Sequence, residues 1–174
     1  MSKTTKSGVA PGQLAGFLPY QLSIASNAVS ELISERYRKR FSLKIPEWRV
    51  MAVLGDAGTA TQRDLTAATV MDKVAVNRAC KVLEERGLVT RAPNARDGRS
   101  HLLELTEEGW AIHREVMPLA LQTESELFDG FAPEERVQFR ALLERMRHRA
   151  AELNGGRASG LDDRLEGGLD QGLD

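Results

Sequence analysis

The stretch that decides the fold is TVMDKVAVNRACKVLEERGLVTRAPNARDGRSHLLEL, residues 69–105. Asp72 is a suitable N-cap, and the apolar residues after it recur every three to four positions until Gly87, which is typical of an amphipathic helix. Beyond Gly87, two short apolar runs flank a polar segment that contains Asp97 and Gly98, and this pattern predicts a β-hairpin. A helix followed directly by a hairpin predicts part of a winged helix-turn-helix.

A shorter helix is expected just before this stretch, from Thr61 through Leu65. A helix-turn-helix needs a turn of three or four residues to aim its second helix at the major groove. The expected turn is Thr69, Val70 and Met71. The second helix would then bury one face, made of Val76, Ala79, Cys80 and Leu83.

The opposite face of this second helix carries side chains that suit the edges of bases. Arginine and lysine match the acceptors of guanine, asparagine matches adenine, and valine can contact the methyl group of thymine. We therefore expect the groove-facing residues to be Lys73, Val74, Asn77, Arg78 and Lys81.

The charge of the chain is distributed unevenly. The formal net charge of the whole chain is −1, which does not favour nucleic acid as a partner. Residues 73–99, however, hold seven basic and three acidic side chains, a net of +4. Positive charge concentrated on one module suits phosphate binding, because counterion release supplies much of the affinity. The charge alone would also fit an ordinary solvated helix.

The remaining helices follow from apolar periodicity and from helix-start signals. We expect a long first helix from about residue 18 to 41, a second that Pro46 opens and Gly55 and Gly58 close, a fifth from Thr106 to about Phe128 with a kink at Pro118, and a sixth that Pro133 opens. The two ends of the chain, residues 1–12 and the Gly/Leu/Asp-rich residues 155–174, are expected to be disordered.

Several classes of function lack support in the sequence. Cys80 is the single cysteine, and the three histidines (His101, His113 and His148) lack the spacing of metal ligands. There is no paired serine and histidine and no phosphate-binding glycine loop, so we expect no catalytic residue, no metal and no cofactor. Without a signal peptide or an apolar run of about 20 residues, the expected location is the cytoplasm and no membrane partner is expected.

Residues 65–89, LTAATVMDKVAVNRACKVLEERGLV, resemble the DNA-binding core of the MarR family of bacterial regulators. The segments NARDGRS (94–100) and LELTEEG (103–109) are similar to the wing of that family, and LPYQLS (18–23) and IPEWRV (45–50) to its first two helices. The resemblance spans roughly residues 14–153. It implies a mainly α fold with a small β-hairpin wing, in which residues 46–105 form the winged helix-turn-helix and residues 13–45 and 106–154 form the dimerisation helices of one domain, 13–154.

The resemblance also implies a partner and further contacts. Members of the family bind double-stranded DNA as homodimers, and many repress transcription, although activators share the fold. Arg99 matches the wing-tip arginine that enters the minor groove, Asp97 its acidic partner, and Arg96 lies in the same wing. Thr61 and Gln62 match positions that touch phosphate. Ala75 and Asn77 depart from the threonine or serine that the family often has there, so the operator preference is left open.

A small-molecule inducer is a further implication of the resemblance. Many such regulators release DNA when a small, often aromatic anion binds between the first, second and fifth helices, and an aromatic acid or its thioester is the expected class. The candidate ligand-binding residues are Ser23, Ser26, Asn27, Ser30, Trp48, Met51 and His113. For Trp48 and Met51, ordinary core packing is the alternative.

Two other hypotheses concern the same module. Cys80 could sense oxidants, but it falls on the inward face of its helix without a second cysteine, which favours a structural role. The module could also contact only protein. The cations kept on both helix and wing, Arg78, Lys81, Arg96 and Arg99, argue against that alternative.

Overall fold

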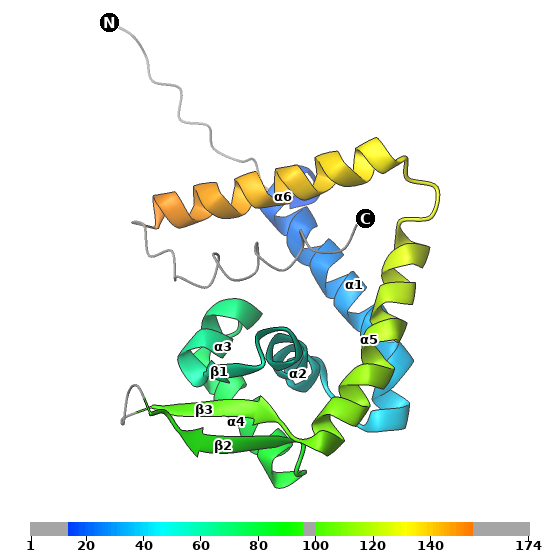
Figure 1. Cartoon of the computed structure of the whole chain (residues 1–174). Coiled ribbons are helices and arrows are strands. Elements are labelled where there is room, and N and C mark those ends of the chain that lie inside the picture. Colours follow the sequence, from blue (N-terminus) through cyan, green and yellow to red (C-terminus); the bar gives the residue numbers. More distant parts are fainter. Residues whose placement is uncertain (1–13, 96–99, 155–174) are drawn as a thin grey trace, which may run out of the picture.

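The computed structural model describes residues 14–95 and 100–154. A short 3-10 turn, η1 (Leu14–Gly16), precedes six helices and three strands (Figure 1). These elements are α1 (Leu18–Phe41), α2 (Ile45–Ala57), β1 (Thr59–Thr61), α3 (Gln62–Thr69), α4 (Lys73–Glu85), β2 (Val89–Pro93), β3 (His101–Leu105), α5 (Glu107–Leu127) and α6 (Pro133–Leu153). The predicted mainly α fold with a small β wing is confirmed.

Side-chain caps set where three of the helices begin. The Asp72 carboxylate accepts a hydrogen bond from the Ala75 amide at 2.8 Å, and the Thr106 hydroxyl accepts one from the Gly109 amide at 3.1 Å. Thr61 caps α3 by accepting from the Asp64 amide at 3.2 Å. Each cap satisfies one of the amides that a helix start leaves unpaired, so all three predicted starts are confirmed.

The third helix is longer than expected. It continues past Leu65 to Thr69, so Thr69 belongs to the helix and not to the turn. Thr69 is buried, and its hydroxyl donates to the Leu65 carbonyl at 2.6 Å. The hydroxyl is thus satisfied within the helix and does not compete for a non-helical backbone. Val70 then ends α3 in the left-handed region, with φ of 53°.

The predicted hairpin is present as β2 and β3, and β1, which the sequence did not predict, adds a third strand to it. The strands are antiparallel in the order β1-β3-β2, with Ala60 opposite Leu103 and Arg91 also opposite Leu103 on the other side. Strand β1 has only three residues, too few for a periodic signal.

Gly55 does not close α2, which continues to Ala57 and ends at Gly58 with φ of 73°. Pro118 lies within α5 without ending it.

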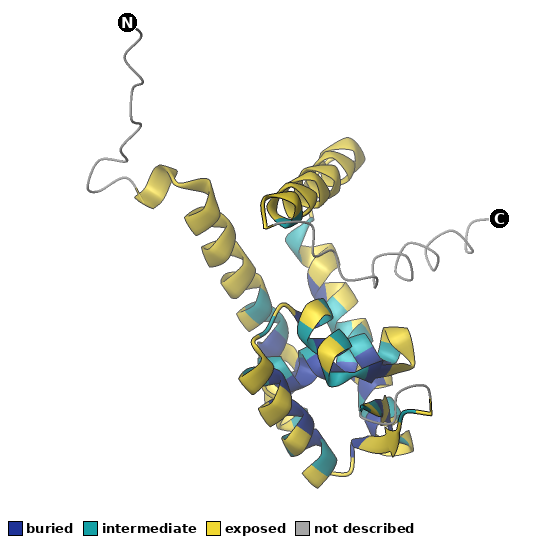
Figure 2. Cartoon of the chain, turned by 90° about the vertical axis from the view of Figure 1, so that its left-hand side faces the viewer, coloured by how far each residue is buried: buried dark blue, intermediate teal, exposed yellow. Residues whose placement is uncertain are grey.

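The core lies between α2, α3, α4 and the sheet. Leu54, Leu65, Leu83 and Leu103 are fully buried at its centre. The predicted inward face of α4 is confirmed, since its four residues are at most 3% exposed. Figure 2 shows the buried residues gathered in this lower part of the molecule.

Two long segments extend from this core. The N-terminal half of α1 is exposed, as is α6 up to Ala150, and α6 contains no buried residue in the described chain (Figure 2). The C-terminal half of α1 packs on α5, where Arg36 pairs with Glu126 at 2.6 Å and Arg40 pairs with Glu115. Within the described residues, no helix is both long and apolar enough to cross a membrane.

Candidate nucleic-acid interface and effector site

Helix α4 presents two different faces. Val76, Ala79, Cys80 and Leu83 are buried, whereas the predicted groove-facing residues are all exposed. Those exposed residues are Lys73, Val74, Asn77, Arg78 and Lys81. Val74 is 68% exposed, which is unusual for an apolar residue on a helix that packs its other face so tightly. The outer face of α4 therefore offers donors, an amide and one apolar group to a partner.

The two predicted phosphate contacts on α3 lie in different environments. The Thr61 hydroxyl is engaged in its own cap, where it also donates to an Asp64 carboxylate oxygen at 2.8 Å. The Gln62 side chain turns inward, and its amide nitrogen is buried with no hydrogen-bond partner among the described residues. The Thr61 hydroxyl and the Gln62 amide group would therefore both have to reorient before either could bind a phosphate.

The wing is described up to residue 95 and again from residue 100. Within that part, Arg91 on β2 pairs with Glu84 on α4 at 2.6 Å, which ties the wing to α4. The predicted wing contacts Arg96, Asp97 and Arg99 lie outside the described residues, as do the predicted tails 1–12 and 155–174.

The candidate ligand residues are divided by the structure. Ser23, Ser26 and Asn27 are exposed on the free half of α1, and Ser30 is half-buried. Met51 is fully buried in the core. Trp48 and His113 lie together, with ring centroids 5.7 Å apart, where α2 meets α5. Of these candidates, Ser30, Trp48 and His113 make contacts between the helices α1, α2 and α5.

Three further residues lie at this junction that the sequence did not predict. Arg49 on α2 donates to the Ser30 hydroxyl at 3.1 Å and places a cation between α1 and α2. Ser34 and Tyr37 continue the polar stripe of α1, since they follow Ser30 by four and seven residues. Helical spacing from Ser30 would have found both, whereas nothing in the sequence pairs Arg49 with Ser30.

Two buried polar atoms at this junction lack partners. Ser34 Oγ and His113 Nε2 have no hydrogen bond among the described residues, although the exposed fractions of the two residues are only 0% and 9%. Burial, followed by the nearby Arg114 charge, lowers the pKa of His113 and so favours the neutral imidazole. A neutral imidazole can either accept or donate a hydrogen bond, which suits it to a polar ligand group or a water.

Cys80 lies on the buried side of α4. Burial raises the pKa of its thiol to about 11, with the Glu84 charge as a second cause. The thiol is therefore protonated near neutral pH, and a protonated buried thiol reacts slowly with oxidants. This favours the structural role over the oxidant-sensing one.

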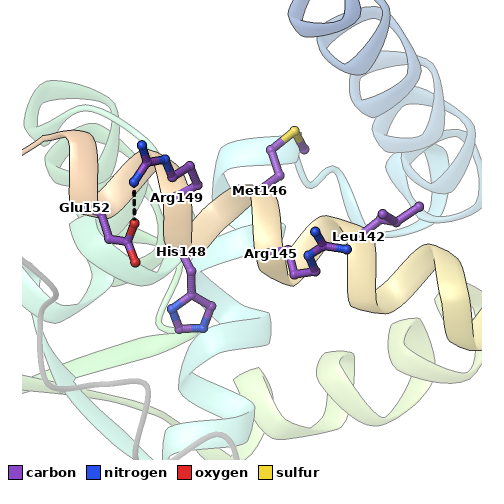
Figure 3. Close-up of a pocket in the computed structure, with 6 residues that line it drawn as sticks. All are labelled: Leu142, Arg145, Met146, His148, Arg149 and Glu152. Atoms are coloured by element: carbon purple, nitrogen blue, oxygen red, sulfur yellow. Dashed lines mark hydrogen bonds and ion pairs between the residues drawn. The ribbon is translucent and has the colours of Figure 1, made fainter.

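An open hollow of about 610 Å³ runs along α6, away from this junction. Its lining residues all come from the one helix (Figure 3): Leu142, Arg145, Met146, His148, Arg149 and Glu152. Arg149 and Glu152 pair with each other at 2.9 Å. None of the candidate ligand residues lines it, so we assign this hollow to the exposed flank of α6 and not to an effector site.

Known proteins share both the sequence of the module and its fold. The model of the MarR family matches residues 41–100. The chain is similar to a MarR/EmrR family transcriptional regulator from Acinetobacter sp. ADP1, with 26% identity and a TM-score of 0.72 over 78% of this chain and 95% of that one. It is likewise similar to BpsR of Bordetella bronchiseptica, whose DNA binding is regulated by 6-hydroxynicotinic acid, with 26% identity and a TM-score of 0.69 over 80% and 98% of the two chains.

A curated relative extends this similarity to a named regulator. The transcriptional repressor NicR of Pseudomonas putida is 31% identical over 96 residues, which cover 55% of this chain and 61% of NicR. The matched residues 41–100 include α4, with its buried and exposed faces, and two of the three strands of the wing, so sequence and structure indicate the same kind of module. Residues 41–100 match the MarR family, and the chain shares the fold of winged helix-turn-helix transcriptional regulators of that family.

Proposed function

We propose that this protein is a ligand-responsive repressor that binds a pseudo-palindromic operator in double-stranded DNA as a homodimer. The observation that carries the proposal is the face of α4 that points away from the core. That face is exposed and carries three cations, one amide and one apolar side chain, while the opposite face is buried. Such a helix is held rigidly enough to present its side chains to base edges in a major groove.

The assignment of roles follows the chemistry of each side chain. Asn77 can form two hydrogen bonds with adenine, Arg78 and Lys81 can donate to guanine or phosphate, and Val74 can contact a thymine methyl group. The wing residues Arg96, Asp97 and Arg99 and the α3 residues Thr61 and Gln62 remain predicted contacts.

The helices α1, α5 and α6 form the arms of the molecule, and a second copy of the chain is the partner that their exposed parts require. Six apolar side chains of α6 are at least 36% exposed, namely Val137, Phe139, Leu142, Leu143, Met146 and Leu153. The free half of α1 exposes Leu18, Leu22 and Ile24 in the same way. Helices with an apolar face gain most of their stability from packing, so two chains that interlock these arms would stabilise both. Two-fold symmetry then predicts DNA half-sites about 10 bp apart.

An aromatic carboxylic acid, or its thioester, is the proposed inducer. The junction of α1, α2 and α5 holds the Arg49 guanidinium, the rings of Tyr37, Trp48 and Trp110, and two buried polar atoms that have no partner among the described residues. An arginine can bind a carboxylate through two hydrogen bonds, and the rings can pack against an aromatic acid. The regulation of BpsR by 6-hydroxynicotinic acid supports this class. A regulator of this kind would act in the cytoplasm, where DNA and metabolites meet.

The first experiment selects the operator. Purified protein is mixed with fragments of genomic DNA, and the retained fragments are sequenced. An enriched inverted repeat supports the proposal, and its absence contradicts it. Asn77→Ala should then weaken binding to that repeat by about 1–3 kcal/mol and change binding to random DNA little. Asn154→Ala, an exposed asparagine at the end of α6, is the matched control.

The second experiment tests the inducer class. Aromatic acids, including 6-hydroxynicotinic acid, are titrated into the complex of protein and repeat. An acid that releases the DNA should fail to do so with Arg49→Gln, while the affinity of that variant for DNA stays near that of the wild type. A full response from Arg49→Gln would exclude Arg49 as the residue that binds the carboxylate.

A further inference from the structure

The C-terminal end of α4 is joined to two helices of the arms, α5 and α1. On one side, the Thr106 hydroxyl at the start of α5 donates to the Gly87 carbonyl at 2.7 Å, and the Thr106 amide donates to the Leu88 carbonyl at 3.1 Å. Gly109 lies so close to the Leu88 carbonyl that a β-carbon there would collide with it. The start of α5 is thus seated directly on the chain that leaves α4.

Arg86 makes the connection on the other side. This C-cap residue of α4 donates from Nη2 to the Phe41 carbonyl at 2.7 Å and from Nη1 to the Ser42 carbonyl at 3.0 Å. Both carbonyls lie at the C-terminal end of α1, where a helix leaves acceptors unpaired and where its dipole favours a cation. The planar fork of one guanidinium therefore links two helix ends that are more than 40 residues apart in sequence.

A buried carboxylate strengthens this connection. Glu47 Oε2 lies 4.0 Å from Arg86 Nη1, and the Glu47 side chain is only 6% exposed. The same oxygen accepts from the Lys44 amide at 2.8 Å, at the start of α2. A buried carboxylate needs a cation or several donors, so Glu47 favours the position in which Arg86 bridges the helix ends. Gly87, with φ of 68°, then lets the chain turn away, and the Leu88 amide bonds back to the Leu83 carbonyl at 2.9 Å.

We propose that Arg86 is a positioning residue for DNA recognition, which couples the orientation of α4 to the end of α1. This inference rests on the proposed function, since α1 belongs to the arms that would form the dimer. Because these hydrogen bonds hold α4 against α1, the distance between the α4 helices of the two copies would depend on how the arms are arranged. Arg86 does not need to touch DNA to set that separation.

The test begins with hydrogen exchange on the full chain without DNA. Arg86→Gln should speed the exchange of amides in residues 41–47 and 83–88 together, because both ends of the bridge are released. The matched control is Arg38→Gln, since Arg38 pairs with Glu31 on its own helix at 2.9 Å. Faster exchange in only one of the two segments, or the same pattern in both variants, would overturn the coupling.

The DNA measurement uses the repeat that the wild type enriches and copies of it with one or two base pairs inserted between the half-sites. Arg86→Gln should bind the native repeat about 10-fold more weakly, a loss in keeping with hydrogen bonds from a charged donor. It should lose less on the altered repeats, so that discrimination by spacing shrinks. Arg86→Lys should restore part of the discrimination by spacing, because the lysine keeps a cation beside Glu47.

The outcomes separate this inference from the proposed function. An equal loss on native, altered and random DNA would show a charge effect only and would overturn the positioning role. If the wild type enriches no repeat, the proposed function fails, and hydrogen exchange still decides whether Arg86 joins α1 to α4. Should Arg86→Gln not fold, Arg86→Lys against Arg38→Lys decides between the same outcomes.

Discussion

The winged module and the arms contain apolar residues of the same kinds but use them in opposite ways. In the module, Leu54, Leu65, Leu83 and Leu103 are fully buried by elements of the same chain. On α6, Leu142, Leu143 and Met146 remain 36–50% exposed. The comparison teaches that the module can be stable within one chain, whereas the apolar surface of α6 has to be covered by something else.

Only a small contact secures the end of α5 to α6 within one chain. Phe128 packs edge-on against Phe131 with ring centroids 5.3 Å apart, and Phe139 lies 5.9 Å from Phe128. This aromatic group holds the turn between α5 and α6, but it leaves most of α6 without a partner element in the described chain. Stability of the module and stability of α6 should therefore respond differently to protein concentration.

The largest expected effect breaks the module. Leu83→Ala should lower the free energy of unfolding by about 2–5 kcal/mol at any protein concentration, because it leaves a cavity in a closed core. Met146→Ala should instead weaken self-association and leave the unfolding of the dilute module nearly unchanged. Urea unfolding across a hundredfold range of concentration, with sedimentation of each variant, separates the two. Glu144→Ala on the same helix is the control, and equal losses from the two apolar variants at low concentration would contradict the comparison.

A smaller effect is expected where the module meets the arms. Gly55 on α2 faces the His113 ring on α5 so closely that a β-carbon would overlap it. Gly55→Ala should therefore cost about 1–3 kcal/mol by overpacking, despite the better helix propensity of alanine. In a His113→Ala background the same change should stabilise the protein, since the ring is gone. Thermal unfolding of the four proteins of this cycle checks the prediction, and a stabilising Gly55→Ala in the wild type would refute it.

The smallest effect concerns pH. The pKa of His113 is lowered in the folded protein, chiefly by burial, so the unfolded chain binds a proton that the folded chain excludes. The unfolding free energy should therefore decrease as the pH falls through about 6.5 and level off below the folded pKa. His113→Gln should flatten this dependence in urea titrations between about pH 7.5 and 5.5. His148→Gln on exposed α6 is the matched control, and a wild-type slope in His113→Gln would exclude His113 as the cause.

The sequence was most informative where neighbours along the chain make the structure. Asp72, Thr61 and Thr106 cap helices through atoms three residues away, and the buried face of α4 follows from a repeat within one helix. Such local patterns are readable because a single element satisfies them. They predicted the helix-turn-helix, the wing and which residues of α4 are exposed.

Tertiary structure decided what distant segments do to one another. Strand β1 exists because β3 offers it an edge, α3 extends because Thr69 is buried, and Gln62 turns inward beside the core. Arg49 reaches Ser30 and Arg86 reaches Phe41 across separations that no local pattern encodes. The physical reason is that propensity and caps act over one or two turns, while hydrogen bonds and burial between elements depend on how whole helices pack. The sequence by itself determined the module and the exposed face of α4, and only the packed chain shows how α4 is tied to α1 and α5.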